Sequence, residues 1–314
     1  MDEIYFVKRD VCPGCGSDCR QTLYACDYLA PPVETYLEDF YLPQGSVEFD
    51  DLSGARYVLD ECRDCGLIYQ EDIPNDFLMT KLYDRWIAPE KVFGEDDHLA
   101  HYADYAQEVM MLIAWLDPAP GSLQVFDFGM GWGRWARIAR AFGCNAYGTE
   151  LSASRITYAR SQGINVIAWD EIPAHQFDFI NTEQVCEHLA HPLETLRYLA
   201  GSLKPGGLIK ISVPNGGDFK RHLKVADWTA PKFSKNSLNA AAPLEHINCF
   251  NYGALMRMAS LTGLEPVERP WPILLRYSLG ADILPGMLKN ILRIYFKGAY
   301  LKRLYYFFRR KAGA

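Results

Sequence analysis

A short apolar run that ends in a glycine-rich turn constrains the fold of this chain more than any other feature. Residues 125–128 are apolar apart from Asp127, the turn supplies Gly129, Gly131 and Gly133, and an amphipathic stretch over 134–142 follows. Glycine permits positive φ angles and close approach of the backbone to a ligand, and the free amides at a helix start face that ligand. Strand, turn and helix in this order predict a binding site for a nucleotide-like cofactor.

Strand and helix patterns continue to alternate after this turn. Further apolar runs predict strands at 146–149, 166–168, 177–180 and 208–213. Helical spacing of apolar residues predicts helices at 76–83, 99–116, 154–162, 191–203 and 252–261. This alternation is typical of an α/β fold with a doubly wound, mostly parallel, Rossmann-like sheet.

Four segments are expected along the chain. They are a zinc-binding ribbon over 1–70, a helical cap over 71–120, a catalytic domain over 121–275 and a basic helical extension over 276–314. Within the catalytic domain, residues 216–245 form a polar and aromatic insertion. Long insertions of this kind tend to carry specificity, so we expect a substrate lid there, with a surface insertion without function as the alternative.

Composition and charge narrow the functional classes. Of the 314 residues, 49% are hydrophobic, which is enough apolar material for a sizeable core and argues against disorder. From Ala281 to the end, eight basic residues against Asp282 give a charge of +7, so the rest of the chain carries −14 within a net charge of −7. Because an acidic body repels phosphates, we expect no nucleic-acid partner.

The sequence predicts a cytoplasmic protein whose C-terminal tail can contact a membrane surface. It has no run of the roughly 18 apolar residues that a spanning helix needs, and its acidic start lacks a leader pattern. In the tail, Lys289, Arg293 and Lys297 recur every four residues opposite apolar side chains. This pattern predicts an amphipathic helix in peripheral contact with the inner face of the membrane. Packing against the body or a second subunit is the alternative, and the oligomeric state stays open.

Two carboxylates stand next to the glycine turn in the expected sheet. Asp127 lies two residues before the first glycine, where it can orient the turn and face a cationic amino-acid group. Glu150 ends the second strand, where a carboxylate can accept hydrogen bonds from both hydroxyls of a ribose.

Taken in order, these blocks resemble the class I S-adenosylmethionine (SAM)-dependent methyltransferases. The resemblance covers about residues 105–270 and includes the glycine turn, Glu150, the Glu187–His188 pair after the fourth strand, and a Lys-Pro-Gly-Gly turn at 204–207. It is nearest to ubiquinone-biosynthesis O-methyltransferases and to small-molecule or sugar methyltransferases. It implies SAM as the cofactor, with its methionine end at Gly129, Gly131 and Gly133, its ribose at Glu150 and its adenine amine near Asp170.

Two histidines are candidates for the general base. Methyl transfer from a sulfonium is an in-line displacement, in which the protein positions the reactants and removes a proton from the acceptor. His188 follows the fourth strand, and His246 precedes the expected helix over 252–261; either is a suitable base at neutral pH.

Two glutamates share the His188 segment. In the ubiquinone-type relatives a Glu-x-x-Glu-His run is associated with a divalent cation, but Gln184 replaces the first Glu of that run. That departure argues against metal-assisted chemistry. Glu187 is a catalytic candidate and Glu183 a cofactor-binding candidate, with a helix cap or a pair with arginine as the alternative for such a glutamate.

Two Cys-x-x-Cys pairs predict a structural zinc site. Cys12 and Cys15 form one pair and Cys62 and Cys65 the other, each followed by a glycine. Four thiolates suit tetrahedral Zn²⁺, and a reducing compartment favours metal over disulfides. The arrangement also resembles the N-terminal zinc knuckles of deoxysugar C-methyltransferases, although those chains usually continue into a further large domain.

The sequence as a whole predicts a SAM-dependent methyltransferase that acts on a hydroxyl of a small molecule, with a sugar or glycan intermediate favoured. C-methylation of a nucleotide-linked deoxysugar is the alternative within the same class. A non-catalytic SAM-binding scaffold protein is the alternative outside it. An RNA methyltransferase conflicts with the acidic body and with the lack of an Asn-Pro-Pro-Tyr-like block after the fourth strand.

Overall fold

The chain divides into two compact units, each assembled from separate segments. The computed structural model describes residues 5–87, 99–119, 121–232, 234–273 and 303–311. The first unit comprises residues 1–96, 186–195 and 213–261. The second comprises residues 97–185, 196–212 and 262–314.

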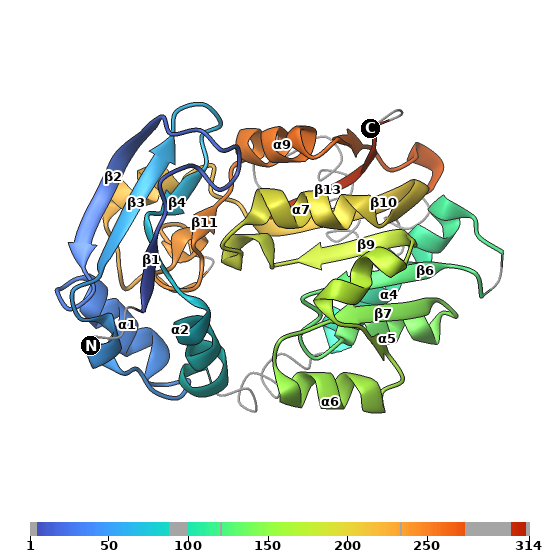
Figure 1. Cartoon of the computed structure of the whole chain (residues 1–314), viewed down its shortest axis with the longest axis horizontal. Coiled ribbons are helices and arrows are strands. Elements are labelled where there is room, and N and C mark those ends of the chain that lie inside the picture. Colours follow the sequence, from blue (N-terminus) through green and yellow to red (C-terminus); the bar gives the residue numbers. More distant parts are fainter. Residues whose placement is uncertain (1–4, 88–98, 120, 233, 274–302, 312–314) are drawn as a thin grey trace. The chain divides into compact units, whose positions relative to one another are not determined.

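The second unit is built on a seven-stranded sheet (Figure 1). Its strands are β6 (Gln124–Phe128), β7 (Asn145–Thr149), β8 (Asn165–Val166), β9 (Phe177–Glu183), β10 (Leu203–Pro214), β12 (Leu264–Val267) and β13 (Arg303–Arg310). They are ordered β12-β13-β10-β9-β6-β7-β8 across the sheet. The five strands from β10 to β8 are parallel and β12 is antiparallel to β13, which confirms the predicted mostly parallel α/β fold.

Helices alternate with these strands. They are α4 (Leu99–Leu116), α5 (Arg134–Ala141), α6 (Ala153–Ser161), the 3-10 helix η3 (Trp169–Ala174) and α7 (Pro192–Gly201). Leu112 of α4 and Trp135 of α5 are buried in one apolar cluster with Phe179 of β9. Burial of these faces holds the helices to the sheet, because each removes large apolar side chains from water.

The strand order places a ligand crevice at the end of β6. One neighbour of β6 is β7, the next strand in sequence, and the other is β9, so the order reverses at this point. In open parallel sheets, ligands bind outside the carboxyl ends of the strands at such a switch point. The glycine turn that follows β6 lies there.

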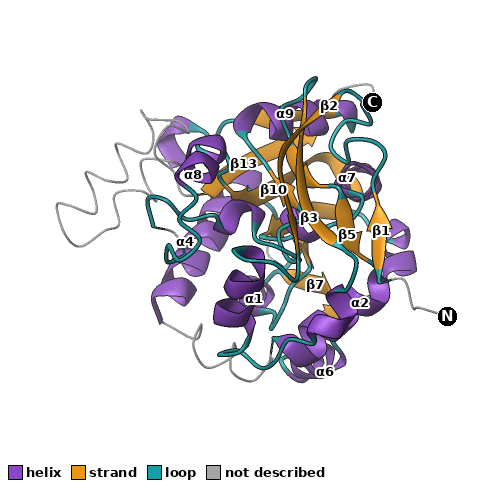
Figure 2. Cartoon of the chain, turned by 90° about the vertical axis from the view of Figure 1, so that its left-hand side faces the viewer, coloured by secondary structure: helices purple, strands orange, loops and turns teal. Residues whose placement is uncertain are grey.

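The first unit contains two small antiparallel sheets (Figure 2). One pairs β1 (Phe6–Lys8) with β5 (Asp72–Pro74), and the other has the order β11-β4-β3-β2, from β2 (Arg20–Asp27), β3 (Arg56–Cys62), β4 (Ile68–Gln70) and β11 (Asn248–Cys249). Its α-helices are α1 (Val33–Tyr41), α2 (Asp76–Lys81), α8 (Phe219–Val225) and α9 (Tyr252–Leu261). Its shorter helical turns are η1 (Phe49–Leu52), η2 (Leu82–Trp86), η4 (Cys186–His188) and η5 (Asn239–Ala241).

The units do not follow the predicted boundaries at residues 70 and 120. Residues 216–245, expected as a lid on the catalytic domain, contribute Phe219, Leu238 and Leu244 to the core of the first unit. All three side chains are buried beside Tyr57 of β3 and Trp86. The segment is therefore part of the structural core of the first unit.

The prediction of a helical C-terminus is wrong for residues 303–310. These residues form β13, whose Phe307 and Phe308 are buried and pair with Val267 and Pro266 of β12. Burial of the apolar side chains inside this run stabilises the strand despite the basic residues at its ends. The predicted helix around Lys289 to Lys297 lies outside the described residues. Within the described part of the chain, no helix is long and apolar enough to cross a membrane.

Candidate functional site

The glycine turn after β6 has the backbone that only glycine adopts easily. The φ angles of Gly129, Gly131 and Gly133 are +66°, +55° and +68°, all in the left-handed region. A Cβ on Gly129 would lie 2.8 Å from Val185 Cγ2, and one on Gly133 would lie 2.5 Å from Ile164 Cδ1. A Cβ on Gly131 would meet no atom within 4 Å, so the middle of the turn is open to a ligand.

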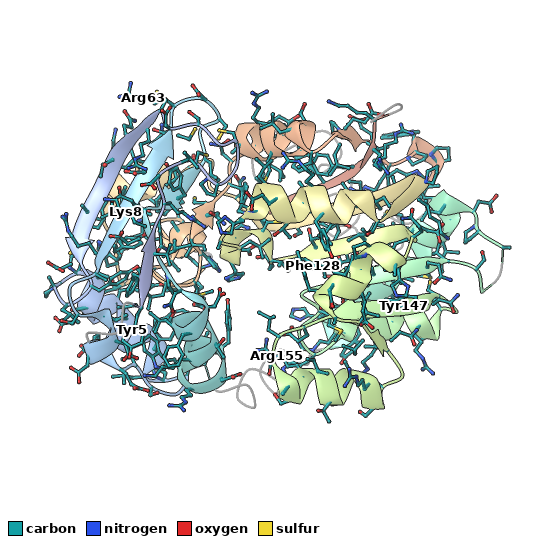
Figure 3. The ribbon with its side chains drawn as sticks, viewed as in Figure 1. Tyr5, Lys8, Arg63, Phe128, Tyr147 and Arg155 are labelled. Atoms are coloured by element: carbon teal, nitrogen blue, oxygen red, sulfur yellow. The ribbon has the colours of Figure 1, made fainter. Side chains whose placement is uncertain are left out.

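Glu150, directly after β7, binds this turn. Its Oε2 accepts a hydrogen bond from the Gly131 amide at 2.9 Å, and its Oε1 accepts from the Leu151 and Ser152 amides at 2.9 and 3.1 Å. Arg155 projects from α6 (Figure 3), and its Nη1 lies 3.9 Å from Oε1. The carboxylate is thus fixed beside the turn, as a ribose-binding role requires.

We expect Glu150→Gln to weaken SAM binding. The amide keeps the size of the side chain but removes the charge that strengthens its hydrogen bonds, a loss of about 1–3 kcal/mol. Titration calorimetry should therefore show the Kd for SAM rising by roughly 5- to 150-fold. Asp170→Asn serves as the comparison, because Asp170 is exposed on η3 and was assigned to adenine on resemblance alone. An unchanged Kd for the Glu150 variant contradicts the ribose role.

Asp127 is buried in the middle of the sheet. Asn181 of β9 donates from Nδ2 to Asp127 Oδ1 at 2.7 Å. Burial raises the pKa of Asp127 to about 7, although the Asn181 hydrogen bond opposes that shift. The side chain therefore changes its charge near neutral pH at the base of the glycine turn.

We expect Asp127→Asn to stabilise the fold at alkaline pH while weakening SAM binding. The folded-state pKa lies above the ordinary value of 3.8, so the protonated side chain contributes stability at low pH that is lost as the pH rises through about 7. The amide mimics the protonated acid and should raise the free energy of unfolding at pH 8 by up to about 4 kcal/mol, with little effect at pH 4. Denaturant titrations at both pH values test this, and equal effects at the two values would contradict it.

Glu183 lies in a buried ion-pair network. Lys210 of β10 is buried, and its Nζ contacts Glu183 Oε2 at 2.9 Å and Glu108 Oε1 of α4 at 2.8 Å. Trp135 Nε1 also donates to Glu108 Oε1, at 2.8 Å, and Tyr305 of β13 donates to Oε2. Glu183 was predicted to bind the cofactor, and in the structure it forms an ion pair with Lys210.

Two tryptophans near the end of β6 and in the glycine turn pack on other side chains. Trp169 stacks on Tyr198 with ring centroids 4.6 Å apart, and it also contacts Phe128. Trp132, inside the glycine turn, meets the Tyr158 ring edge-on at 5.5 Å. About half of the Trp169 surface remains exposed beside the end of β6.

In the first unit, the two candidate bases lie side by side. The rings of His188 and His246 have centroids 4.8 Å apart. His188 Nδ1 lies 2.8 Å from the Glu245 carbonyl oxygen, and His246 Nδ1 bonds to the Asn239 carbonyl oxygen. A carbonyl oxygen only accepts, so each Nδ1 carries the proton and each Nε2 carries the lone pair. The structure therefore brings both predicted residues together in the tautomer of a base.

Burial and charge keep both rings neutral. Burial lowers the pKa of His188 to about 4 and that of His246 to about 3, and the positive charge of Lys232 acts in the same direction. Glu187 is buried as well, and its Oε1 lies 3.9 Å from His188 Nε2. The ligand atoms of Glu187, His188 and His246 lie within 4.8 Å of one another, a spacing open to a metal ion. The positive charge of Lys232 opposes a cation there.

Tyr83 is a member of this site that sequence reasoning missed. Its hydroxyl lies 3.1 Å from His188 Nδ1, and the two rings meet edge-on at 6.2 Å. A single tyrosine in a helical pattern, 105 residues from the histidine, gives no signal in the sequence.

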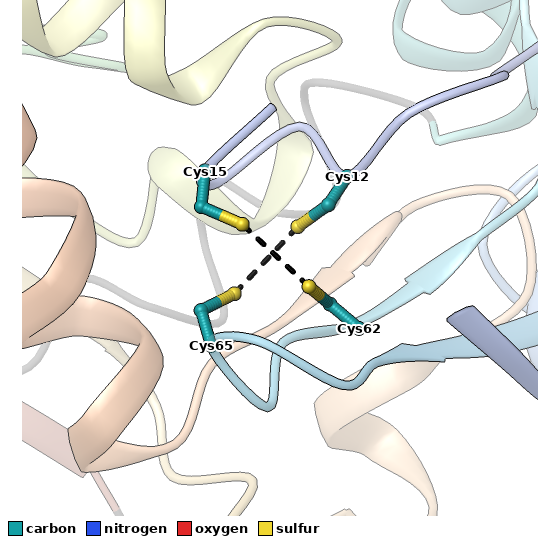
Figure 4. A group of neighbouring side chains, drawn as sticks. All are labelled: Cys12, Cys15, Cys62 and Cys65. Carbon is teal, nitrogen blue, oxygen red and sulfur yellow. Dashed lines mark hydrogen bonds between the residues drawn. The ribbon is translucent and has the colours of Figure 1, made fainter. Parts of the chain in front are cut away.

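The four predicted cysteines converge in the first unit (Figure 4). The Sγ atoms of Cys12 and Cys65 are 3.6 Å apart and those of Cys15 and Cys62 are 3.5 Å apart. Tetrahedral zinc with bonds of about 2.3 Å separates its sulfur ligands by about 3.8 Å. Gly16 and Gly66, which follow the two pairs, have φ of +79° and +77° and donate to Cys12 and Cys62 carbonyls. The cluster, here called the cysteine knuckle, fits a zinc ion.

Proteins similar to this chain are methyltransferases. The methyltransferase domain family matches residues 98–269, which is more than half of the chain. The ubiquinone biosynthesis O-methyltransferase of Bordetella avium (strain 197N) is 26% identical over 117 residues, 33% of this chain and 48% of that protein. The chain thus matches about half the length of this relative.

Solved structures similar to this chain include two methyltransferases. The plantazolicin methyltransferase BamL, in complex with a triazolic desmethylPZN analog and SAH, is 12% identical with a TM-score of 0.52, covering 74% of this chain and 94% of that one. A TehB-like SAM-dependent methyltransferase from Corynebacterium glutamicum is 16% identical with a TM-score of 0.42, covering 76% and 100%.

Proposed function

The chain belongs to the methyltransferase domain family and is a class I SAM-dependent methyltransferase, and from this premise we propose that it methylates a hydroxyl group of a sugar or glycan intermediate. The observation that carries the proposal is the partly buried histidine pair. Both Nδ1 atoms are held by carbonyl oxygens, so both Nε2 lone pairs are available to a hydroxyl proton. A site of this kind suits an oxygen acceptor.

The residues of this chain have separate tasks in the proposed reaction. The bound cofactor supplies an electrophilic methyl group. The glycine turn and Glu150 hold it, and His188 Nε2 accepts the proton of the acceptor hydroxyl, with His246 beside it. Glu187 stabilises the imidazolium that forms.

A cleft in the first unit supports a sugar as the acceptor. It has a volume of about 210 Å³ and is lined by Tyr36, Phe40 and Trp228 together with Asp39 and Lys232. Aromatic faces pack against the C–H face of a sugar ring, and a lysine binds an anionic substituent. Asn239 also lines the cleft, and its carbonyl accepts the His246 proton. Asn239 thus connects the cleft with His246.

Binding and product analysis test the proposal together. Titration calorimetry with SAM and with S-adenosylhomocysteine should show binding in the micromolar range, roughly 8 kcal/mol. Nucleotide sugars and lipid-linked glycans are then incubated with SAM carrying a ¹³C-methyl group. A new O-methyl signal supports hydroxyl methylation, a C-methyl signal supports the deoxysugar alternative, and SAM binding without any product supports the scaffold reading.

We also infer that the cysteine knuckle holds a structural zinc ion and that the protein has no nucleic-acid partner. The acidic body argues against phosphate contacts.

Peripheral membrane contact through the basic tail remains part of the proposal. Since β13 belongs to the sheet, the test must leave it intact. Replacing Lys289, Arg293 and Lys297 by Gln should reduce co-sedimentation with anionic vesicles, because each basic residue near such a surface contributes about 1 kcal/mol. Unchanged co-sedimentation would contradict membrane contact, and neutral vesicles are the control.

A further inference from the structure

Arg9 binds both loops that carry the histidines. Its Nη2 donates to the carbonyl oxygens of Leu189 and Ala190 at 3.1 and 2.9 Å, directly after His188. Its Nη1 donates to the carbonyl oxygen of Ile247 at 3.1 Å, directly after His246. The side chain is buried, so these bonds are shielded from water. One planar guanidinium thus joins two loops that lie far apart in the sequence.

Asn248 completes this connection. Its Oδ1 accepts from Arg9 Nη1 at 2.9 Å, and its Nδ2 donates to the carbonyl oxygens of Cys186 and Leu189 at 2.9 and 2.7 Å. Cys186 and Leu189 bracket Glu187 and His188 in the chain. Asn248 is itself anchored in β11, where it pairs with Tyr69 of β4. Arg9 and Asn248, here called the clamp, therefore fix both histidine loops to one sheet.

The clamp begins beside the cysteine knuckle. Arg9 lies three residues before Cys12, and its backbone is held by bonds from Arg9 N to Glu71 O at 2.8 Å and from Arg20 Nη1 to Arg9 O at 2.9 Å. A knuckle that binds metal through thiolates would thus fix the backbone before Cys12, from which the Arg9 side chain extends.

We propose that Arg9 is a positioning residue for His188 and His246, and that it makes the geometry of the pair depend on the state of the cysteine knuckle. Without the guanidinium the two loops lose one shared anchor, while Asn248 and the His188–Glu245 hydrogen bond remain, and the rings shift relative to each other. Misplacement by about 1 Å costs on the order of 100-fold in rate for an oriented reaction. The expected effect on turnover rests on the proposed function, whereas the effect on the rings does not.

The test compares Arg9→Gln and Arg9→Lys with Arg63→Gln. Arg63 lies next to Cys62 on the knuckle, but its side chain is exposed and bonds only to Gln21 among the hydrogen bonds described for it. The protein is labelled with ¹⁵N-histidine, and the His188 and His246 signals are identified with the two alanine variants. Ring ¹⁵N shifts report the tautomer, calorimetry reports SAM affinity and steady-state kinetics report kcat.

We expect wild-type protein and Arg63→Gln to show the Nδ1–H tautomer at both rings. Arg9→Gln should show mixed tautomers and a kcat reduced by roughly 10- to 100-fold with an unchanged Kd for SAM. Removing the metal from wild-type protein with a chelator should change the same two signals.

Wild-type ring spectra in folded Arg9→Gln overturn the proposal. If Arg9→Gln does not fold, Arg9→Lys decides by the same spectrum, because a single ammonium keeps the charge but cannot span both loops. The ring signals can also change in Arg9→Gln while the wild-type protein turns over no acceptor. That result supports the role of the clamp and contradicts the proposed function.

Discussion

His188→Ala is expected to reduce kcat by roughly 10²- to 10⁴-fold, the usual contribution of a positioned general base. His188 Nδ1 donates to the Glu245 carbonyl, so the truncation removes the Nε2 lone pair and leaves that carbonyl without its partner. The Kd for SAM should stay within about twofold, because the glycine turn and Glu150 belong to the second unit. Steady-state kinetics and calorimetry on the same sample measure both quantities.

The pH dependence separates a base from a structural histidine. Burial lowers the pKa of His188 to about 4, so the ring is already deprotonated at neutral pH. At saturating SAM, where titration of Asp127 no longer limits cofactor binding, we expect kcat to stay constant from pH 8 to about pH 5 and to fall as the pH drops through 4. His222→Ala is the matched control, since His222 lies in the same unit and its Nδ1 also bonds to a carbonyl, that of Ser237 at 3.0 Å. Equal kcat values for the His188 variant and wild type would remove His188 as the base.

Local patterns were sufficient to predict the sheet and the glycine turn. The helices over 99–116 and 252–261 have the predicted bounds, because amphipathic spacing sets their buried face and turn-forming residues set their ends. The turn was predictable because φ between +55° and +68° at three positions requires glycine. Each of these features depends on residues close together in the chain.

Long-range pairing was not predictable in the same way. The apolar side chains of β13 are not strictly alternating, and its partner β12 ends at Val267, far from it in the sequence. The run was therefore interpreted as the continuation of a helix. The same holds for the first unit, where Phe219 and Leu244 pack with Tyr57 of β3, since nothing near residue 219 in the sequence marks that partner.

The sequence identified several residues of the candidate site but not the contacts that connect them. His188 and His246 were proposed as alternatives, whereas the structure makes them neighbours that share one environment. Tyr83 and Arg9 reach this site from the N-terminal segment through contacts across 105 and 180 residues. Single polar residues at such separations carry no periodicity or spacing, so only the fold shows them.

Removing the metal is expected to destabilise the first unit while the second still binds SAM. Four thiols that lie within 4.8 Å of one another do not stabilise the fold without a metal. A bound zinc ion would link the turn before β2 to the end of β3 through its four bonds. Structural zinc sites in small peptides contribute about 10–16 kcal/mol. The apolar core around Tyr57 and Trp86 retains part of the stability of this unit, so we expect a smaller loss, of about 5 kcal/mol. For a unit of this size, that lowers Tm by about 10–20 °C.

Cys62→Ser and Cys19→Ser distinguish this zinc effect from a general effect of losing a cysteine. Cys62 contributes one of the four converging sulfurs, whereas Cys19 is exposed and outside the cluster. Elemental analysis should find one zinc per chain in wild type and Cys19→Ser, and much less in Cys62→Ser. Only Cys62→Ser should show the early unfolding transition, while its Kd for SAM stays near that of wild type because the glycine turn has its own core. A Cys62→Ser protein with wild-type Tm would show that the knuckle does not hold this unit together, and loss of SAM binding with the metal would show that the two units do not fold independently.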